Sequence, residues 1–374
     1  MTTLASLSTE LCLALRITCG VYLTASLVIQ PTLHNGAARG HRTSQGGLDV
    51  TTTTTESAAA SRTPASWPAL RRLDRRVTTV SNSAMREHID ALGLQNVFNP
   101  SVTVVADRTL VAFRALAARA GRSRFDAHLL SIPRHGAPHH WNLTDHCANF
   151  GIKVVADPKL VLIDDGVHIT FNTGHPGVGE RNALYLMPVT AGPSHPRQCH
   201  FAPRRRVEKN WAFFSDRGAL HAVYQLDPVT VLEATDETGT TVRFSKRTED
   251  GSGRGAQRAL GVRRTHSLGT QPIQDEAGLH MVVHEKFHVR GRRLYLGRAV
   301  SVLNPTSRPR VRFSSIRLCG SLRAMFGAPK KHNPNLISAT YFSGLSTSAF
   351  GLVVSYGIND VEYDIRELQW SDLW

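Results

Sequence analysis

The most constraining feature of this sequence is a hairpin-like unit that recurs along most of its length. Each unit begins with polar residues or a proline, continues in an apolar run, turns at Asp, Gly or Arg, and ends in a second alternating run. Four complete units and a shorter fifth segment are Phe98–Arg114, Val155–Phe171, Glu208–Tyr224, Leu268–Glu285 and Phe350–Asp360. They lie roughly 50–60 residues apart, with a longer last gap, as blades do in a propeller. The sequence therefore predicts an all-β fold, a five-bladed β-propeller with a disordered N-terminal extension.

The net positive charge of the chain limits the kinds of molecule that it is expected to bind. The 374 residues carry a formal net charge of +15, with 41% hydrophobic residues, enough for a sizeable core. This charge favours an anionic partner such as nucleic acid, a phosphorylated glycan or a membrane surface. The arginine clusters, such as Arg71–Arg76, Arg204–Arg206 and Arg290–Arg293, are expected outside the strands, without interleaved aromatic residues that could stack on bases. Nucleic acid is therefore disfavoured.

The N-terminal part is expected to lie outside the propeller. Leu11–Gln30 is apolar and about long enough to span a bilayer, so residues 1–30 are interpreted as a signal or membrane-anchor segment. Arg16 interrupts it and no basic residue precedes it, which weakens this interpretation. Residues 31–76 are rich in Thr, Ser, Ala, Gly and Arg, which predicts a disordered linker before a propeller domain at 77–374. A secretory or membrane-associated location is favoured, and the membrane is a partner only through this segment.

Metal and cofactor sites are not expected. The five cysteines include no CxxC pair. The histidines of His135–His140 share their segment with Gly136 and Pro138, which favours a loop over a metal site. Gly174–Gly179 lacks the Lys-Ser/Thr of a phosphate-binding loop, so a turn is expected there.

Short motifs at the unit starts occur in an order that resembles a known group. They are Asn99-Pro100-Ser101 with Arg114, Asp157-Pro158-Lys159, Lys209-Asn210, Gly269–Ile273 with His284, and Ser355-Tyr356-Gly357 with Asp360. This order resembles the five-bladed propeller glycosidases, most closely the β-mannoside phosphorylases with their hydrolase and mannosyltransferase relatives. The resemblance covers most of residues 95–365.

The resemblance implies a role for Asp157 as the proton donor of an inverting reaction. A carboxyl group in a partly dry site is expected to have a raised pKa, which suits an acid that protonates a leaving oxygen. Pro158 is expected to hold Asp157 in an extended conformation. Inverting hydrolysis also requires a second carboxylate as base, for which Glu208 and Asp360 are the candidates.

The resemblance also implies a basic lining and a set of groups that hold sugar hydroxyls. The residues expected to contact acceptor or phosphate are Arg114, Lys159, Lys209 and His284. Those expected to contact the sugar are Asn99, Glu208, Asn210, Tyr356 and Asp360. The implied partners are a glycan or sugar phosphate and inorganic phosphate.

Two departures from the group's pattern keep alternatives open. The group has Glu-Asp-Pro-Arg where this chain has Ala156-Asp157-Pro158-Lys159, so an acid and a planar guanidinium fork are lost. Phosphorolysis, hydrolysis and glycosyl transfer all remain open. So do a non-catalytic glycan-binding propeller and a basic scaffold for nucleic acid or an anionic membrane.

Overall fold

The computed structural model describes residues 69–74, 80–119, 122–164, 166–250, 258–259, 262–289, 291–322, 325, 333 and 335–374. The expected targeting segment 1–30 and most of the expected linker 31–76 lie outside the described residues. In the described part of the chain, no helix is both long and apolar enough to cross a membrane.

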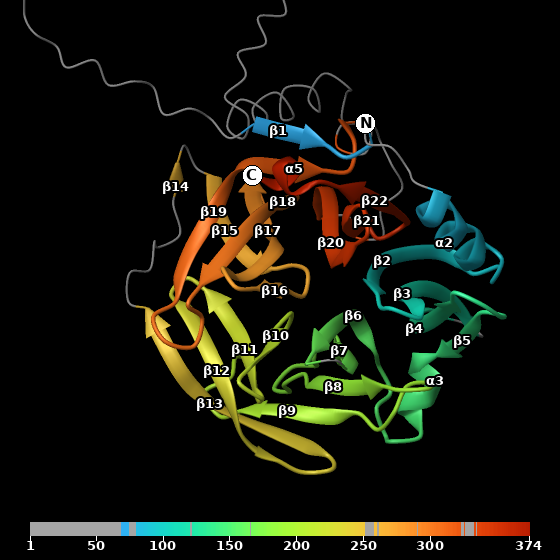
Figure 1. Ribbon diagram of the computed structural model, residues 1–374, viewed down its shortest axis with the longest axis horizontal. Coiled ribbons are helices and arrows are strands. Elements are labelled where there is room, and N and C mark those ends of the chain that lie inside the picture. The colour runs from blue at the N-terminus through green and yellow to red at the C-terminus, as the bar shows by residue number, and fades with distance from the viewer. Residues whose placement is uncertain are drawn as a thin grey trace, which may run out of the picture.

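Within the described residues the fold is mainly β, and its strands form five antiparallel runs that succeed one another along the chain (Figure 1). The first run is β2 (Gln95–Val104), β3 (Arg108–Arg119), β4 (Arg122–Pro133) and β5 (His139–Asn142). The second is β6 (Ala156–Ile163), β7 (Gly166–Asn172), β8 (Leu184–Val189) and β9 (Arg197–Phe201). The third is β10 (Ala212–Asp216), β11 (Ala219–Leu226), β12 (Val229–Glu237) and β13 (Thr241–Asp250).

The last two runs share one sheet, because β18 and β20 pair in parallel. The fourth run is β14 (Arg258–Ala259), β15 (Val262–Leu268), β16 (Ile273–Asp275), β17 (Gly278–Val289), β18 (Arg292–Leu303) and β19 (Arg310–Cys319). The fifth is β20 (Leu336–Ser348), β21 (Gly351–Ile358) and β22 (Glu362–Leu368). Three helices of the described residues flank the sheets: α2 (Val80–Asp90), α3 (Leu143–Ala148) and α5 (Trp370–Leu373).

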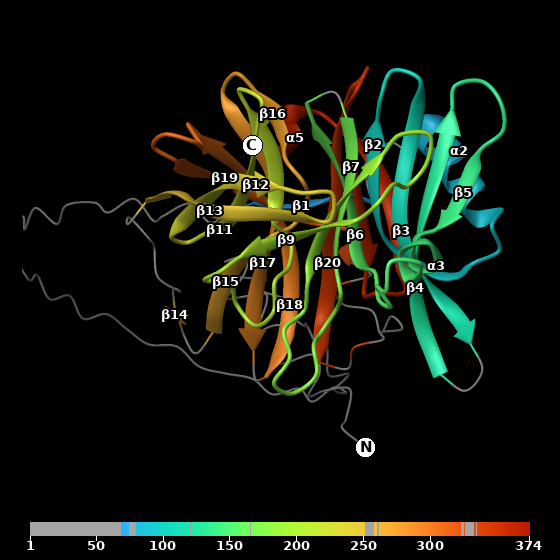
Figure 2. The same cartoon turned by 90° about the horizontal axis from the view of Figure 1, so that it is seen from below.

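Buried apolar clusters lie between consecutive runs and close them around a common centre. One cluster joins each run to the next, and a further one joins Val353 and Ile365 of the last run to Val102 and Phe113 of the first. Continuous apolar stretches such as Leu110–Phe113 are buried on both faces because a neighbouring run covers each side. Figure 1 shows the first run beside the last, and Figure 2 shows β6 and β20 side by side near the middle.

Side chains also tie the runs together by bonding to a neighbour's backbone. Ser101 Oγ accepts from the Leu160 amide at 2.9 Å, which links the first run to β6. Gln271 Oε1 accepts from the Phe213 amide at 2.9 Å, and its Nε2 donates to the Trp211 carbonyl at 2.8 Å. The beginnings of β6 and β10 are therefore fixed relative to the adjacent runs.

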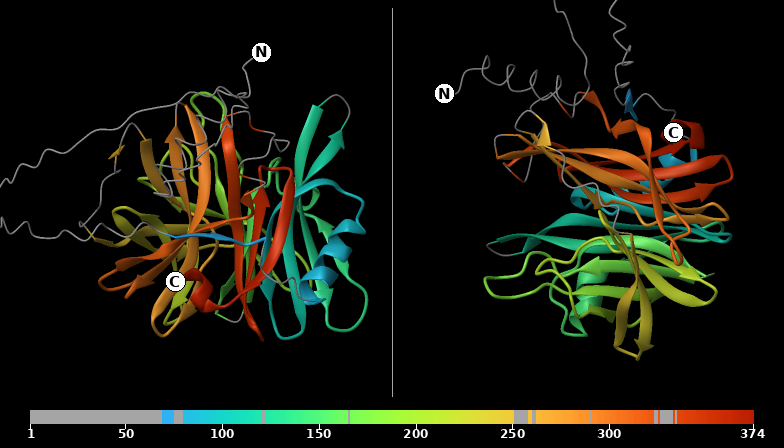
Figure 3. Two further views of the ribbon diagram at one scale, coloured as in Figure 1. Left: turned by 90° about the horizontal axis from the view of Figure 1, so that it is seen from above. Right: turned by 90° about the vertical axis from the view of Figure 1, so that its left-hand side faces the viewer.

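The N-terminal boundary of the folded part differs from the expectation. Strand β1 (Ala69–Arg72) pairs in parallel with β19, and Figure 3 shows it along the sheet of the fourth run. Leu73 is fully buried, and Leu70 packs on a buried cluster of the fourth run. The prediction that the disordered linker extends to residue 76 is wrong at its end, since these leucines bury apolar surface.

The predicted hairpins are confirmed for the first four units. They correspond to β2–β3, β6–β7, β10–β11 and β16–β17. Strand β3 runs unbroken through Arg114, the last residue of the first unit. The fifth segment holds β21, which is the second strand of its run, after β20.

Candidate active site

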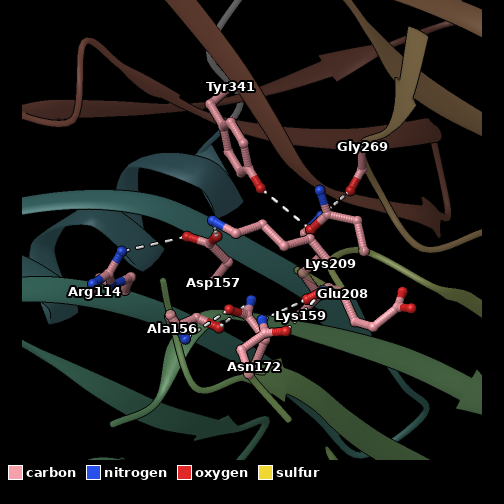
Figure 4. Close-up of polar contacts among 12 residues, drawn as sticks. Arg114, Ala156, Asp157, Lys159, Asn172, Glu208, Lys209, Gly269 and Tyr341 are labelled. Carbon is pink, nitrogen blue, oxygen red and sulfur yellow. Dashed lines mark hydrogen bonds and ion pairs between the residues drawn. The ribbon is translucent and has the colours of Figure 1, made fainter. Parts of the chain in front are cut away.

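Asp157 lies where three runs approach one another (Figure 4). It belongs to β6, Arg114 to β3, and Lys209 to the segment before β10. Arg114 Nη1 is 3.4 Å from Asp157 Oδ1, and Lys209 Nζ is 3.7 Å from Asp157 Oδ2. The side chains of Lys209, Arg114 and Asp157 are 31%, 17% and 11% exposed, so the carboxylate is largely enclosed while its cations reach solvent. We call Arg114, Asp157, Lys159, Lys209 and Asn210 the Asp157 cluster.

The backbone at Asp157 is left-handed, with φ of 51°, and the prediction of an extended conformation is wrong. The β6–β7 register shifts between Ala156 and Lys159, so the Asp-Pro pair forms a bulge in its strand. Proline has no N–H to give to the ladder, and aspartate tolerates positive φ better than most residues. Asn99, which also precedes a proline, has φ of 51° at an equivalent shift in β2–β3. The bulge directs the Asp157 side chain toward Arg114 and Lys209.

The pKa of Asp157 is lowered rather than raised. Burial raises it, but the nearby charges of Lys209, Arg114 and Lys159 outweigh burial and bring the pKa from 3.8 to about 2. The expectation of a raised pKa is therefore wrong. Three cations around one carboxylate leave it ionised at neutral pH.

Lys159 is a supporting residue that does not line the site as expected. Its side chain is among the largest that are fully buried, and its Nζ donates to Asn210 Oδ1 at 2.8 Å and to the Gly269 carbonyl. Burial lowers its pKa to about 7. The Tyr341 hydroxyl also donates to Asn210 Oδ1, at 3.3 Å. Because this oxygen accepts two bonds, the Asn210 amide group is left to donate to a ligand.

His284 is neutral and fully buried. Its Nε2 lies 2.9 Å from the Phe342 carbonyl, which can only accept, so the ring hydrogen is on Nε2. Burial and the charges of Lys159 and Lys286 hold the pKa of His284 well below 6.5. The ring lies 4.2 Å from that of Tyr341, and Nδ1 is a buried acceptor without a hydrogen-bond partner in the described residues. A neutral imidazole does not supply the positive charge expected for phosphate.

Glu208 supports the backbone beside Lys209 and is unsuited to act as a base. Its Oε2 accepts from Trp211 Nε1 at 3.0 Å, and its Oε1 accepts from the Tyr224 hydroxyl at 2.9 Å. Its backbone exchanges two hydrogen bonds with the Asn182 side chain, at 2.7 and 2.8 Å. These contacts use both carboxylate oxygens and fix the residue that precedes Lys209.

The remaining expected residues divide between the site and the core. Tyr356 is fully buried, and its hydroxyl donates to Asp364 at 3.0 Å, so it is a core residue rather than a sugar contact. Asn99 is 3% exposed and packs on Gly357, where a Cβ would lie 1.9 Å from its Oδ1. Asp360 raises the pKa of Tyr341, which places its charge near the Asp157 cluster.

Sequence reasoning missed Lys286 and Arg293. Arg292 and Arg293 lie in β18, and Arg71 and Arg72 lie in β1, so the expectation that these arginines lie outside the strands is wrong for all four. Lys286 follows His284 by two residues and therefore shares its face of β17. The spacing of His284 and Lys286 could have revealed Lys286 in the sequence. Only the strand register shows that Arg293 lies beside Lys286.

No protein-family model matches the chain, and no curated protein matches it by sequence. Solved structures do show similarity. A glycosyl hydrolase from Bacteroides ovatus is 12% identical, with a TM-score of 0.46 over 74% of this chain and 85% of that one. A β-1,2-mannobiose phosphorylase from Listeria innocua is 13% identical, with a TM-score of 0.45 over 75% and 91%.

A GDP-Man-dependent mannosyltransferase from Leishmania mexicana is 10% identical, with a TM-score of 0.47 over 79% of this chain and 95% of that one. The three structures are named as a glycosyl hydrolase, a phosphorylase and a mannosyltransferase, and at 10–13% identity their similarity to this chain is one of fold alone.

Proposed function

We propose that this protein is a carbohydrate-active enzyme that forms or cleaves a glycosidic bond, with phosphate or a sugar phosphate as partner and Asp157 as general acid. The observation that carries the proposal is the enclosed Asp157 carboxylate between Arg114 and Lys209, which come from two other runs of strands. An acid beside cations that reach solvent suits a reaction in which an anion and a leaving oxygen meet.

The fold part of the proposal is a five-bladed propeller. The five antiparallel runs would be its blades, and the domain would extend from about residue 77 to Trp374, with β1 added to its fourth blade. The apolar cluster between the last and the first run supports closure of the ring.

The low pKa of Asp157 gives phosphate a specific part in this reaction. A phosphate bound by Arg114 and Lys209 would offset the positive charge that keeps Asp157 ionised, and burial would then raise its pKa. At neutral pH most of the bound phosphate is a dianion, because its second pKa is about 6. Binding of the anion would therefore supply the nucleophile, and Asp157 would take up a proton from water as its pKa rises.

The proposed step is phosphorolysis of the glycosidic bond. A phosphate oxygen attacks the anomeric carbon, the bond from that carbon to the leaving oxygen breaks, and the proton on Asp157 passes to the leaving oxygen. The products are a sugar 1-phosphate and a free hydroxyl group, and the reverse reaction is glycosyl transfer. Hydrolysis needs a second carboxylate as base, and of the two candidates the Glu208 carboxylate is already held by Trp211 and Tyr224. Because only Asp360 is left for this role, hydrolysis is disfavoured relative to phosphorolysis.

A non-catalytic glycan-binding protein is the second candidate. The observation that favours it is the full burial of Lys159, whose ammonium group is used by Asn210 and Gly269. If the charged residues of the Asp157 cluster serve only to hold structure, Asn210 and Asp360 could still bind sugar hydroxyls.

The test is synthesis from mannose 1-phosphate and a panel of sugar acceptors, with Asp157→Asn beside the unchanged protein. Asp236→Asn is the matched control, because Asp236 is 56% exposed and pairs only with Arg243 at 3.5 Å among the ion pairs of the described residues. We expect product with the unchanged protein and the control, and a loss of about 100-fold or more with Asp157→Asn. Equal product from Asp157→Asn refutes the acid role, and sugar binding without product from any variant favours the second candidate.

A further inference from the structure

A second group of cations lies on one face of the fourth run, beside the Asp157 cluster. His284 and Lys286 alternate along β17 and so point to the same side of the sheet. In the β17–β18 register, Lys286 is opposite Tyr295 and His288 is opposite Arg293. Directly opposite residues of antiparallel strands share a face, so Lys286, Arg293 and Tyr295 lie together.

Side-chain contacts confirm this grouping and connect it to the Asp157 cluster. Lys286 Nζ lies 5.4 Å from the centre of the Tyr295 ring, and Arg293 Nη1 donates to the Tyr295 hydroxyl at 3.3 Å. The His284 ring lies between the two groups, 6.3 Å from that of Tyr295 and 4.2 Å from that of Tyr341. Tyr341 in turn bonds to Asn210 of the Asp157 cluster. A continuous set of contacts therefore joins the two groups.

The charges of the two groups act on one another. Burial, Lys209 and Arg293 lower the pKa of Lys286 and Asp157 raises it, which together bring the pKa to about 8. The pKa of His175 is likewise lowered by Lys209 and Arg293 and raised by Asp157. Neither Lys286 nor Arg293 has a carboxylate within salt-bridge distance among the described residues. Holding these cations together without an anion is unfavourable.

We propose that Lys286 and Arg293 form a second anion subsite, so that the ligand of this site carries two phosphate groups rather than one. The inference rests on the proposed function in taking Arg114 and Lys209 as the partners of the first phosphate. Lys286 and Arg293 bind the second, with Tyr295 holding the Arg293 guanidinium in place. The two phosphates belong either to one diphosphate or to separate positions of a sugar.

The test measures binding of inorganic phosphate, inorganic pyrophosphate and a hexose 1,6-bisphosphate by calorimetry. Lys286→Gln and Arg293→Gln are compared with Lys246→Gln, a control at an exposed lysine that pairs with Glu249. The unchanged protein is expected to bind one of the two-phosphate ligands about 10-fold or more tightly than phosphate. Tighter binding of pyrophosphate would identify a diphosphate group as the ligand, and tighter binding of the bisphosphate would identify a sugar with two separate phosphates.

Each variant at the second subsite is expected to lose about 10-fold in affinity for the two-phosphate ligand and less than about 3-fold for phosphate. Arg293 is only partly buried, so its variant serves if Lys286→Gln does not fold. Equal affinity for one and two phosphates, or equal losses for both, overturns the second subsite. Turnover of mannose 1-phosphate that persists in that case leaves the proposed function standing, so the two failures are distinguishable.

Discussion

Replacing Glu285 by Gln is expected to destabilise the protein strongly, although this residue points away from the Asp157 cluster. Glu285 is fully buried on the face of β17 opposite to His284 and Lys286. Arg317 Nε and Nη2 both donate to its carboxylate, and Arg264 Nη1 and Arg298 Nη1 lie 3.3 and 3.7 Å from it. One carboxylate therefore compensates three guanidinium groups in the core of the fourth run.

Two estimates of the cost agree. Removing one partner of a buried ion pair costs about 3–5 kcal/mol, because the remaining charge stays buried. Burial raises the pKa of Glu285, but His266 and Arg317 outweigh it and lower the pKa from 4.5 to about 2. That shift corresponds to roughly 3 kcal/mol at neutral pH. At about 2–4 °C per kcal/mol, the Tm of Glu285→Gln falls by roughly 6–20 °C.

The assay is thermal and urea unfolding, with Glu249→Gln as the control at an exposed ion pair. The control is expected to change stability by less than about 0.5 kcal/mol. Because the folded pKa of Glu285 is lowered, its contribution is present above pH 4.5 and is lost as the pH falls toward 2. Glu285→Gln should lack this part of the acid dependence. A loss below about 1 kcal/mol at pH 7 would refute the reasoning.

Three further results are expected. Gly297→Ala loses about 1–3 kcal/mol in urea unfolding, because its Cβ would lie 2.3 Å from the Phe342 ring, and a loss below about 0.5 kcal/mol contradicts this. Tyr356→Phe loses about 1–3 kcal/mol through the Asp364 bond with turnover unchanged, so a selective loss of turnover would restore Tyr356 as a substrate contact. Affinity for sulfate, measured by calorimetry, falls up to about 10-fold between pH 7 and 9 as Lys286 loses its proton, and a flat profile rules this out.

Two of these experiments have matched controls in the chain. Gly239 has open space around its Cα and no positive φ, so Gly239→Ala is expected to be neutral in unfolding. For the sulfate titration, Lys286→Gln should show a weaker dependence on pH than the unchanged protein. Sulfate is used because its own charge does not change over this range.

Local patterns were sufficient to predict the hairpins, because their turns and alternating runs are adjacent in the sequence. For example, Asp164 follows β6 and Gly166 begins β7, and both residue types are common in turns. Strand β20 escaped prediction because its Ser, Thr and Gly residues do not form an apolar run, although most of it is buried. Strand β1 could not be predicted either, since its stability depends on β19, more than 200 residues away.

In the candidate site, too, some features could be predicted from the sequence and others depend on distant parts of the chain. The left-handed residues and the meeting of three runs at Asp157 depend on strand register, and motif order alone brought Arg114, Asp157 and Lys209 together as a hypothesis. The direction of the Asp157 pKa shift was predicted wrongly, because the shift combines burial with the charges of several residues that are distant in the sequence. Similarly, the use of Glu208 by Trp211 depends on side-chain directions that a sequence does not display.

The left-handed residues also set the stability of the fold against the proposed activity. Asn99, Asp157 and Asn210 hold φ of 51°, 51° and 60°, a conformation that costs a residue with a Cβ about 1 kcal/mol or more. Glycine would adopt it freely, so a chain with glycine at all three points would gain in backbone energy and lose the groups that could meet a sugar. Directed evolution for heat resistance alone would therefore be drawn toward an inert molecule, and any screen on this scaffold has to select for turnover at the same time.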